Sequence, residues 1–151
     1  MTALTRTAPS TRFCSRCGAA AADPNRRVCD QCEEGVLLGC PEDVSPGESF
    51  LICTYELDVT AVSEAGEEVF GPQEQLVGAH LLDVVSCPLG DEQVATHAAL
   101  AAQRAGDPVE LPLRVRSGVG EALGMLAARI TTCGPPRAAL LTAQPTSFGR
   151  R

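Results

Sequence analysis

Two Cys-x-x-Cys pairs near the start of the chain are the residues with the clearest chemical potential. They are Cys14 with Cys17 and Cys29 with Cys32, and eleven residues separate the pairs. Thiolates two residues apart on a tight turn can face one ion at roughly 2.3 Å, and two such turns supply the four tetrahedral ligands of zinc. Gly18 follows Cys17 and lets the first turn curl so that amide groups point at the sulfurs, whereas the second pair has no such glycine. We therefore predict a zinc site built from these four cysteines.

The spacing of the pairs resembles that of the zinc-ribbon and rubredoxin-like knuckle families. Iron in a rubredoxin-like site and a redox-active dithiol pair are the alternatives. The redox alternative is disfavoured because no strand and helix follow the pairs to place a thiol at a helix start. Four thiolates leave no open position for water, so the zinc is expected to be structural and to supply the folding free energy of a segment too small for its own core.

The other four cysteines are not expected to bind the metal. Cys40 could replace one ligand, but its spacing is unsuitable. Cys53, Cys87 and Cys133 lie in apolar or loop contexts and are expected to be buried or incidental thiols.

Length and composition suit one domain with a small appendage. The 151 residues are 44% hydrophobic and 21% charged, which supports a packed core. Residues 1–34 carry a net charge of +1, and residues 35–151 carry −8, so the larger part should repel nucleic acid. The sequence shows no secretory signal and no apolar run of the roughly 20 residues that span a bilayer. We expect a soluble, cytoplasmic protein that does not contact a membrane.

Turn residues and composition divide the chain into five parts. The expected division is a disordered tail at 1–12, the knuckle at 13–34, a linker at 35–48, the main domain at 49–145 and a second tail at 146–151.

The first half of the main domain is predicted to contain a hairpin and short helices. Residues 49–63 give two β-rich stretches joined by a turn. A short helix is expected at 64–70, ended by Gly71 and Pro72, and one or two helical turns at 73–85.

The second half is predicted to contain one long helix and strands. A helix is expected at 92–105, with Asp91 as its N-cap. Residues 109–116 alternate as a strand, and Pro112 places that strand at a sheet edge. Residues 121–133 slightly favour a helix by their period, although their end is β-rich. The apolar residues after Pro136 suit a buried strand.

The stretch "LICTYELDVTAVSEAGEEVFGPQEQLVGAHLLDVV" resembles the opening of a PAS domain, and the predicted element order from 49 to 143 fits that family. Asp58, Gly71 and the turn at 74–78 stand where the family has corresponding residues. The resemblance implies an α+β fold, a five-stranded antiparallel sheet with helices on one face, and makes 121–133 a strand. PAS domains sense ligands, cofactors, light or redox state, or mediate protein contacts.

The resemblance also bears on cofactors. Flavin photosensors of this family carry a cysteine after the position of Gly78, where this chain has His80 and Leu81, so a cysteine adduct is excluded. Haem-binding members use a histidine on the long helix, which makes His97 the one haem candidate. Beyond that candidate, neither haem nor flavin is expected.

Catalytic motifs are missing from the sequence, so we do not expect an enzyme. The leading interpretation is a non-catalytic signalling or regulatory module that binds a protein partner or a small molecule and could form a homodimer. The alternative is a zinc-ribbon transcriptional regulator with an acidic regulatory domain, in which arginines near the knuckle contact nucleic acid. Those arginines are Arg12, Arg16, Arg26 and Arg27.

Overall fold

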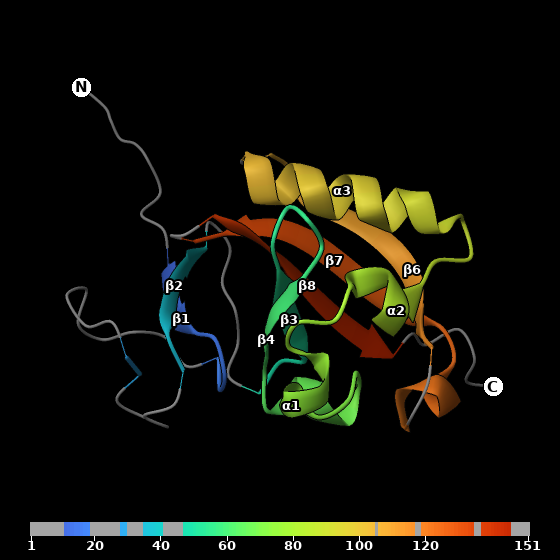
Figure 1. Cartoon of the computed structure of the whole chain (residues 1–151), viewed down its shortest axis with the longest axis horizontal. Coiled ribbons are helices and arrows are strands. Elements are labelled where there is room, and N and C mark those ends of the chain that lie inside the picture. Colours follow the sequence, from blue (N-terminus) through green and yellow to red (C-terminus); the bar gives the residue numbers. More distant parts are fainter. Residues whose placement is uncertain are drawn as a thin grey trace.

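A computed structural model gives the fold, in which one antiparallel sheet is covered by helices on one face and by a small hairpin on the other (Figure 1). The structure describes seven ranges of residues: 11–18, 28–29, 35–40, 47–104, 106–116, 119–134 and 137–145. Cys32 of the predicted knuckle lies outside these ranges. So do the two expected tails, 1–12 and 146–151, except for residues 11 and 12.

The main sheet contains six strands, in the order β4-β3-β8-β7-β6-β5, and every neighbouring pair is antiparallel. The strands are β3 (Phe50–Cys53), β4 (Val59–Val62), β5 (Val85–Ser86), β6 (Val109–Val115), β7 (Leu126–Cys133) and β8 (Ala138–Pro145). The expectation of five strands was wrong by one, because the two-residue strand β5 pairs with the end of β6. A strand of two residues has no periodicity that a sequence could reveal.

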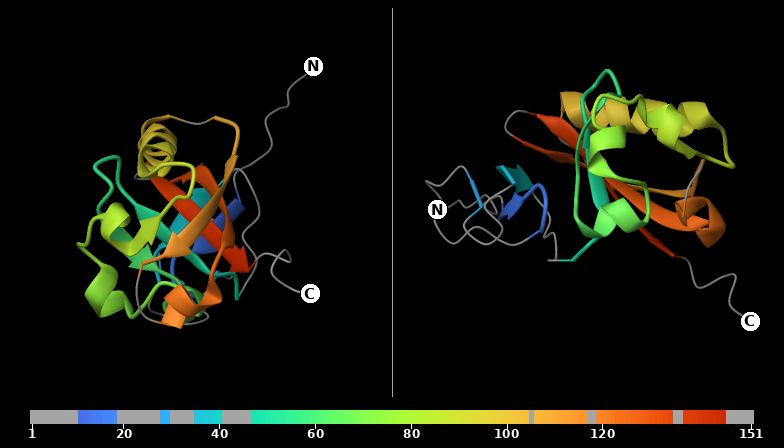
Figure 2. Two further views of the ribbon diagram at one scale, coloured as in Figure 1. Left: turned by 90° about the vertical axis from the view of Figure 1, so that its right-hand side faces the viewer. Right: turned by 60° about the horizontal axis from the view of Figure 1, so that its bottom comes forward.

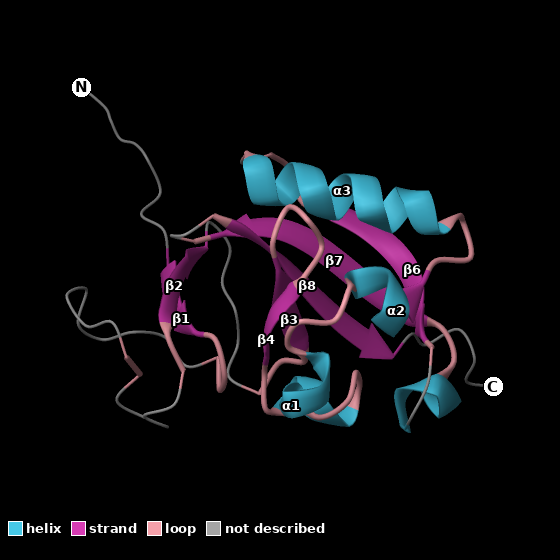
Figure 3. Cartoon of the chain, in the orientation of Figure 1, coloured by secondary structure: helices cyan, strands magenta, loops and turns pink. Residues whose placement is uncertain are grey.

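Short helical segments connect the strands, and one long helix packs on the sheet (Figure 3). They are the 3₁₀ helix η1 (Ala65–Glu68), α1 (Gln73–Leu76), α2 (Leu81–Val84), α3 (Asp91–Gln103) and the 3₁₀ helix η2 (Val119–Leu123). Apart from β5 and η2, which were not expected, this order of strands and helices follows the one that the PAS resemblance implies for residues 49–143.

Helix α3 confirms the long helix predicted at 92–105, but its start differs from the prediction. Gly90, with a φ of 119°, is the N-cap, and Asp91 is the first helical residue. The Asp91 carboxylate accepts a hydrogen bond from the backbone N–H of Cys87 at 2.9 Å and forms an ion pair with Arg116 at 2.6 Å. Asp91 therefore ties the start of the helix to the preceding loop and to the end of β6.

The slight helical preference for 121–133 was wrong for most of that range, because residues 126–133 form strand β7 and only the first residues belong to the 3₁₀ helix η2. Leu126, Ala128 and Ile130 are buried at alternate positions, as a strand requires, and point into the core beneath the helices. β7 lies between β6 and β8 and pairs along both edges, so tertiary pairing decides its conformation.

Pro112 lies on the open side of β6. The predicted edge position is only partly right, because β5 covers β6 at Arg114 and Val115. Among the described residues no strand pairs with the outer side of Pro112, which agrees with its lack of an amide donor.

The inner face of the sheet holds the main core. Helix α3 contributes Val94, Ala98 and Ala102 to this core, together with alternate residues of β3, β6, β7 and β8. Both ends of β4 and Val85 of the short β5 complete it. Among these strand residues are Leu51, Val59, Leu113, Ile130 and Leu141.

The outer face of the sheet is covered at β3 and β8 by a two-stranded antiparallel sheet, β1 (Thr11–Cys14) with β2 (Leu37–Cys40). We call this pair the hairpin, although its strands are 22 residues apart in the sequence. Figure 2 shows the hairpin and the short helices α1 and α2 on different sides of the sheet. Phe13 and Leu38 of the hairpin pack with residues of the strands β3, β7 and β8, namely Phe50, Ile52, Cys133, Ala138 and Leu140. The segment expected to be a linker, 35–48, therefore contains a strand.

No helix among the described residues has both the length and the apolar character needed to cross a bilayer.

Candidate metal centre

Three of the four predicted ligands come together in the structure. The ligand atoms of Cys14, Cys17 and Cys29 all lie within 4.8 Å of one another. The Sγ atoms of Cys17 and Cys29 are 3.8 Å apart, and two thiolates on one tetrahedral zinc, each roughly 2.3 Å from the ion, are separated by roughly 3.8 Å. Cys32 lies outside the described residues, so its part in the site stays a prediction.

The three cysteines are placed by the hairpin and the segments beside it. Cys14 is the last residue of β1, Cys17 follows in the turn, and Cys29 is held by a bond from its N–H to the carbonyl of Gly35 at 3.0 Å. Cys14 and Cys29 are buried, and Cys17 is partly exposed. This burial limits the access of water to the sulfurs.

Backbone amides point at the sulfur of Cys14, as the sequence predicted for the first turn. The N–H groups of Arg16 and Cys17 donate to Cys14 Sγ at 3.2 and 3.4 Å. Gly18 adopts a φ of 80°, and its N–H donates to the carbonyl of Cys14 at 3.1 Å, which closes the turn. Such donors stabilise a thiolate, the form of cysteine that binds a metal.

Gly35 is a residue of the site that the sequence analysis missed. A Cβ atom on Gly35 would lie 2.1 Å from Cys14 Sγ and 2.9 Å from the backbone nitrogen of Arg16. Only glycine lets the backbone pass this close to the sulfur. In the sequence the only sign of this role is a glycine three residues after Cys32. The second pair has no glycine directly after its last cysteine, whereas Gly18 directly follows the first pair.

The donor set fits zinc. Three thiol sulfurs converge, and soft thiolate ligands in tetrahedral geometry select zinc or iron over hard cations such as magnesium. Within the part of the chain that the structure describes, no other group of three or more histidine, cysteine or acidic side chains has this arrangement. Cys14, Cys17 and Cys29 would hold the ion, which would supply cross-linking of the knuckle.

Arg16, between the first two cysteines, is held by the main sheet. Its guanidinium donates to the carbonyl of Val62 at 2.6 Å and to the Glu67 carboxylate at 3.1 Å. Its side chain is 13% exposed. Of the four arginines considered for nucleic-acid contact, Arg16 is thus engaged within the protein; the side chains of Arg12, Arg26 and Arg27 lie outside the description.

The Glu67 carboxylate accepts two hydrogen bonds that favour its charged form. The backbone N–H of Gln73 donates to it at 2.8 Å, and Arg16 donates on the other oxygen. These two bonds, that of Gln73 first, lower the pKa of Glu67 below its ordinary value.

Three further cysteines are buried, as the sequence predicted, and lie apart from the metal cluster in the core of the sheet and its loops. They are Cys53, Cys87 and Cys133. Burial, together with the nearby charge of Asp58, raises the pKa of Cys53 to about 12. Cys53 is therefore a neutral, unreactive thiol at physiological pH.

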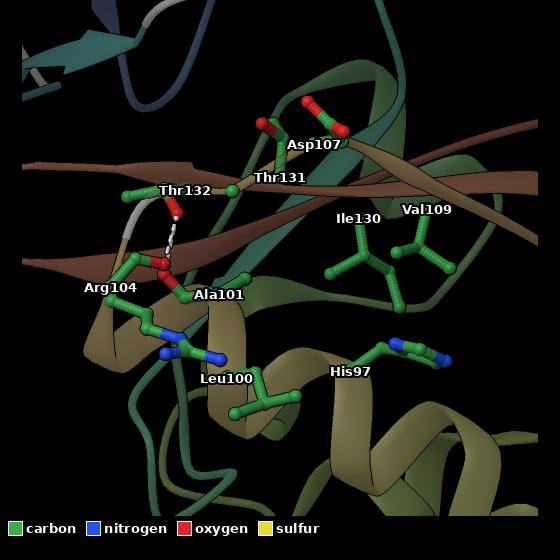
Figure 4. Close-up of a pocket in the computed structure, with 10 residues that line it drawn as sticks. His97, Leu100, Ala101, Arg104, Asp107, Val109, Ile130, Thr131 and Thr132 are labelled. Atoms are coloured by element: carbon green, nitrogen blue, oxygen red, sulfur yellow. Dashed lines mark hydrogen bonds between the residues drawn. The ribbon is translucent and has the colours of Figure 1, made fainter.

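His97, the haem candidate, lies on α3 at a small hollow between that helix and the strands β6 and β7 (Figure 4). The hollow has a volume of about 140 Å³ and is lined by Leu100, Ala101, Arg104, Asp107, Ile130 and Thr132, among others. Ligand pockets are usually on the order of 300 to 1,000 Å³, and the Thr132 hydroxyl there is already bonded to the Ala101 carbonyl at 2.7 Å. The haem role of His97 stays a sequence-based prediction.

A larger groove of about 590 Å³ runs along the outer face of the sheet, over β6, β7 and β8. Outward-facing residues line it, including Glu110, Pro112, Ala127, Arg129, Thr142 and Gln144. It occupies the part of the outer face that the β1–β2 hairpin does not cover.

Three comparisons relate the chain to known proteins. No model of a protein family matches it, and no curated protein matches it. One similar solved structure is a PAS domain from a two-component sensor histidine kinase, with 14% sequence identity and a TM-score of 0.45. That similarity covers 68% of this chain and 87% of the other.

Proposed function

We propose that this protein is a non-catalytic signalling or regulatory module, in which a PAS-like unit binds a protein partner or a small molecule and a structural zinc knuckle is built onto it. The observation that carries the proposal is the convergence of the Cys14, Cys17 and Cys29 sulfurs within 4.8 Å, beside a hairpin that packs on the sheet.

A structural role for the metal is supported by the donor set. With Cys32 as the fourth ligand, four thiolates would fill the coordination sphere and leave no position for water or substrate. The buried sulfurs and the amides that donate to Cys14 fit a closed site. A metal without an open position stabilises a fold and does not act on a substrate.

A PAS-like unit is supported by the order of elements in residues 49–145. Apart from the two-residue β5, two strands, short helices, a long helix and three strands follow one another as the sequence resemblance implies. The resemblance implied a strand at 121–133 against the local period, and β7 occupies residues 126–133 of that range, after the 3₁₀ helix η2. PAS-like units serve as sensors or as contact domains, so a role in regulation follows from this part of the proposal.

The nucleic-acid alternative is weakened by Arg16. Its guanidinium is bonded to Val62 and Glu67, so it does not face a phosphate in this conformation. The charge of −8 on residues 35–151 also opposes a polyanion. A gel-shift titration of the full chain with labelled DNA and RNA at low salt tests the alternative; a shift that weakens with added salt would favour it over our proposal.

The proposal is tested by elemental analysis, an absorption spectrum and native mass spectrometry of the purified full chain. We expect one zinc per chain and no visible band. A coloured, iron-containing protein would replace zinc with a rubredoxin-like site, and a Soret band would assign haem to His97. Protein without metal, in which zinc addition does not alter the thermal midpoint, would overturn the proposed knuckle.

The regulatory part has its own test. Native mass spectrometry and isothermal titration should reveal a retained small molecule or a defined protein complex, and the full chain should not turn over generic ester, phosphoester or peptide substrates. Turnover that is lost on a single side-chain substitution would overturn the non-catalytic assignment.

A further inference from the structure

Arg16 joins the metal cluster to the sheet at three points. Its backbone N–H donates to Cys14 Sγ at 3.2 Å, and its carbonyl accepts from the N–H of Glu64 at 2.7 Å. Its guanidinium reaches Glu67 and the carbonyl of Val62. The orientation of the amide that faces the sulfur is therefore set by groups that lie about fifty residues further along the chain.

Glu67 is itself fixed, so it can hold Arg16 in place. One carboxylate oxygen accepts from the N–H of Gln73, at the start of α1, and the other accepts from Arg16. The Gln73 side chain also lies 3.4 Å from the Arg16 guanidinium and accepts from the N–H of Val62 at 3.3 Å. Arg16 thus enters a preformed group of acceptors on β4, η1 and α1.

A second set of contacts joins the hairpin directly to the main sheet. Phe13, one residue before Cys14, packs edge-on against Phe50 of β3, with ring centroids 5.5 Å apart. Gly39 and Gly134 exchange two backbone hydrogen bonds, which connect β2 to the end of β7. The knuckle and the sheet therefore share both polar and apolar contacts.

We propose that Arg16 and Glu67 are positioning residues of the metal centre, so that metal affinity and the order of the β4, η1 and α1 region are coupled. This inference rests on the proposed zinc knuckle. The physical reason is linkage: contacts that hold the knuckle in its metal-binding geometry raise metal affinity, and bound metal stabilises those contacts by the same factor.

The test is a double-mutant cycle on zinc affinity in the full chain, measured by competition with a chromogenic chelator. The variants are Arg16→Ala, Glu67→Ala and the double substitution. We expect each single variant to bind zinc about 10-fold or more weakly, in the range typical of groups that orient metal ligands. The double variant should lose little more than either single one, because both act through one contact.

Asp91→Ala is the matched control. Like Glu67, Asp91 accepts one backbone N–H and one arginine, but its partners, Cys87 and Arg116, belong to the start of α3 and the end of β6. Its zinc affinity should equal that of the unsubstituted chain. Equal loss in Asp91→Ala and Glu67→Ala would show general destabilisation and would overturn the coupling.

Hydrogen exchange gives an independent readout that does not depend on any substitution. Chelation of zinc should increase amide exchange in residues 59–76 and leave the centre of α3 unchanged. Zinc binding by the unsubstituted chain, with unaltered affinity in Glu67→Ala and no change in exchange at 59–76, would reject the coupling but keep the knuckle. Failure of the unsubstituted chain to bind zinc would instead reject the proposed function.

Discussion

A Cβ atom on Gly35 would lie 2.1 Å from the sulfur of Cys14, although 20 residues separate the two along the chain. The backbone at Gly35 also accepts the N–H of Cys29, so one glycine fixes the approach of both sides of the metal site. The second half of the knuckle thus uses close packing where the first half uses a left-handed turn at Gly18.

Gly35→Ala should weaken zinc binding by about 10-fold or more, because the methyl group must displace Cys14 or the backbone of Arg16. Chelator competition measures the loss. Gly106→Ala is the control, since a Cβ at Gly106 meets no atom within 4 Å. Unchanged affinity in Gly35→Ala would mean that Cys14 does not bind the metal in this position.

Phe13→Ala should lower the free energy of unfolding by about 3 to 5 kcal/mol, the usual cost of removing a buried phenyl ring. Phe13 is fully buried against Phe50, so the loss should appear in a single cooperative transition of the zinc-loaded chain in urea. Tyr55→Ala is the control, because Tyr55 is 55% exposed. Two separate transitions, with the main one unaltered, would show that the knuckle folds apart from the sheet.

Stability on the acid side should depend on Glu67. The pKa of the Glu67 carboxyl is lowered in the folded chain from its ordinary value of 4.5. Glu67 therefore stabilises the fold fully at pH values above 4.5, and this contribution is lost as the pH falls through the lower pKa that Glu67 has in the folded chain. Thermal midpoints between pH 7 and pH 3 should fall less steeply in Glu67→Gln than in the unsubstituted chain. Parallel curves would contradict the effect, and since zinc ligands protonate in both proteins, only the difference is assigned to Glu67.

Stability on the alkaline side should depend on Cys53. The pKa of the Cys53 thiol is 9.0 in the unfolded chain, and burial raises it to about 12 in the folded chain. The unfolded state therefore loses a proton first, and the contribution of this thiol, complete below pH 9, is lost as the pH rises toward 12. Cys53→Ala should show a shallower decline above pH 9, and mass mapping at pH 8 should find Cys53 unmodified by iodoacetamide in the folded chain.

Cys32 is expected to be the fourth ligand. Cobalt substitution should give a thiolate-to-metal absorption that decreases in Cys32→Ser, with zinc affinity lowered as well, because an oxygen replaces a soft ligand. Cys40→Ser should leave both unchanged. The opposite pattern would exchange the roles of the two cysteines.

The spacing of the cysteines was enough to predict that the sulfurs of Cys14, Cys17 and Cys29 converge, because two Cys-x-x-Cys turns at this spacing are typical of a shared metal site. The roles of Gly35 and Glu67 could not be predicted in this way. Glu67 lies 51 residues from Arg16, and a glutamate in an acidic stretch carries no sign of the arginine it will meet. From the sequence alone Gly35 is an ordinary loop glycine, and only the structure shows that its backbone lies beside the sulfur of Cys14.

The main domain was predictable in its order of elements but less so in its details. Leu126 and Ile130 fit the face of a helix as well as that of a strand, and only the pairing of β7 with both neighbours decides between them. β2 was missed because four residues, "LLGC", become a strand only when β1 and the end of β7 are beside them. Local sequence carries no information about such partners.

The position of the hairpin also limits how a second molecule could approach the sheet. Phe13 and Leu38 already cover the surface above Phe50 and Leu140. A partner molecule that binds the outer face of the sheet must therefore displace the hairpin or bind in the neighbouring groove over β6, β7 and β8.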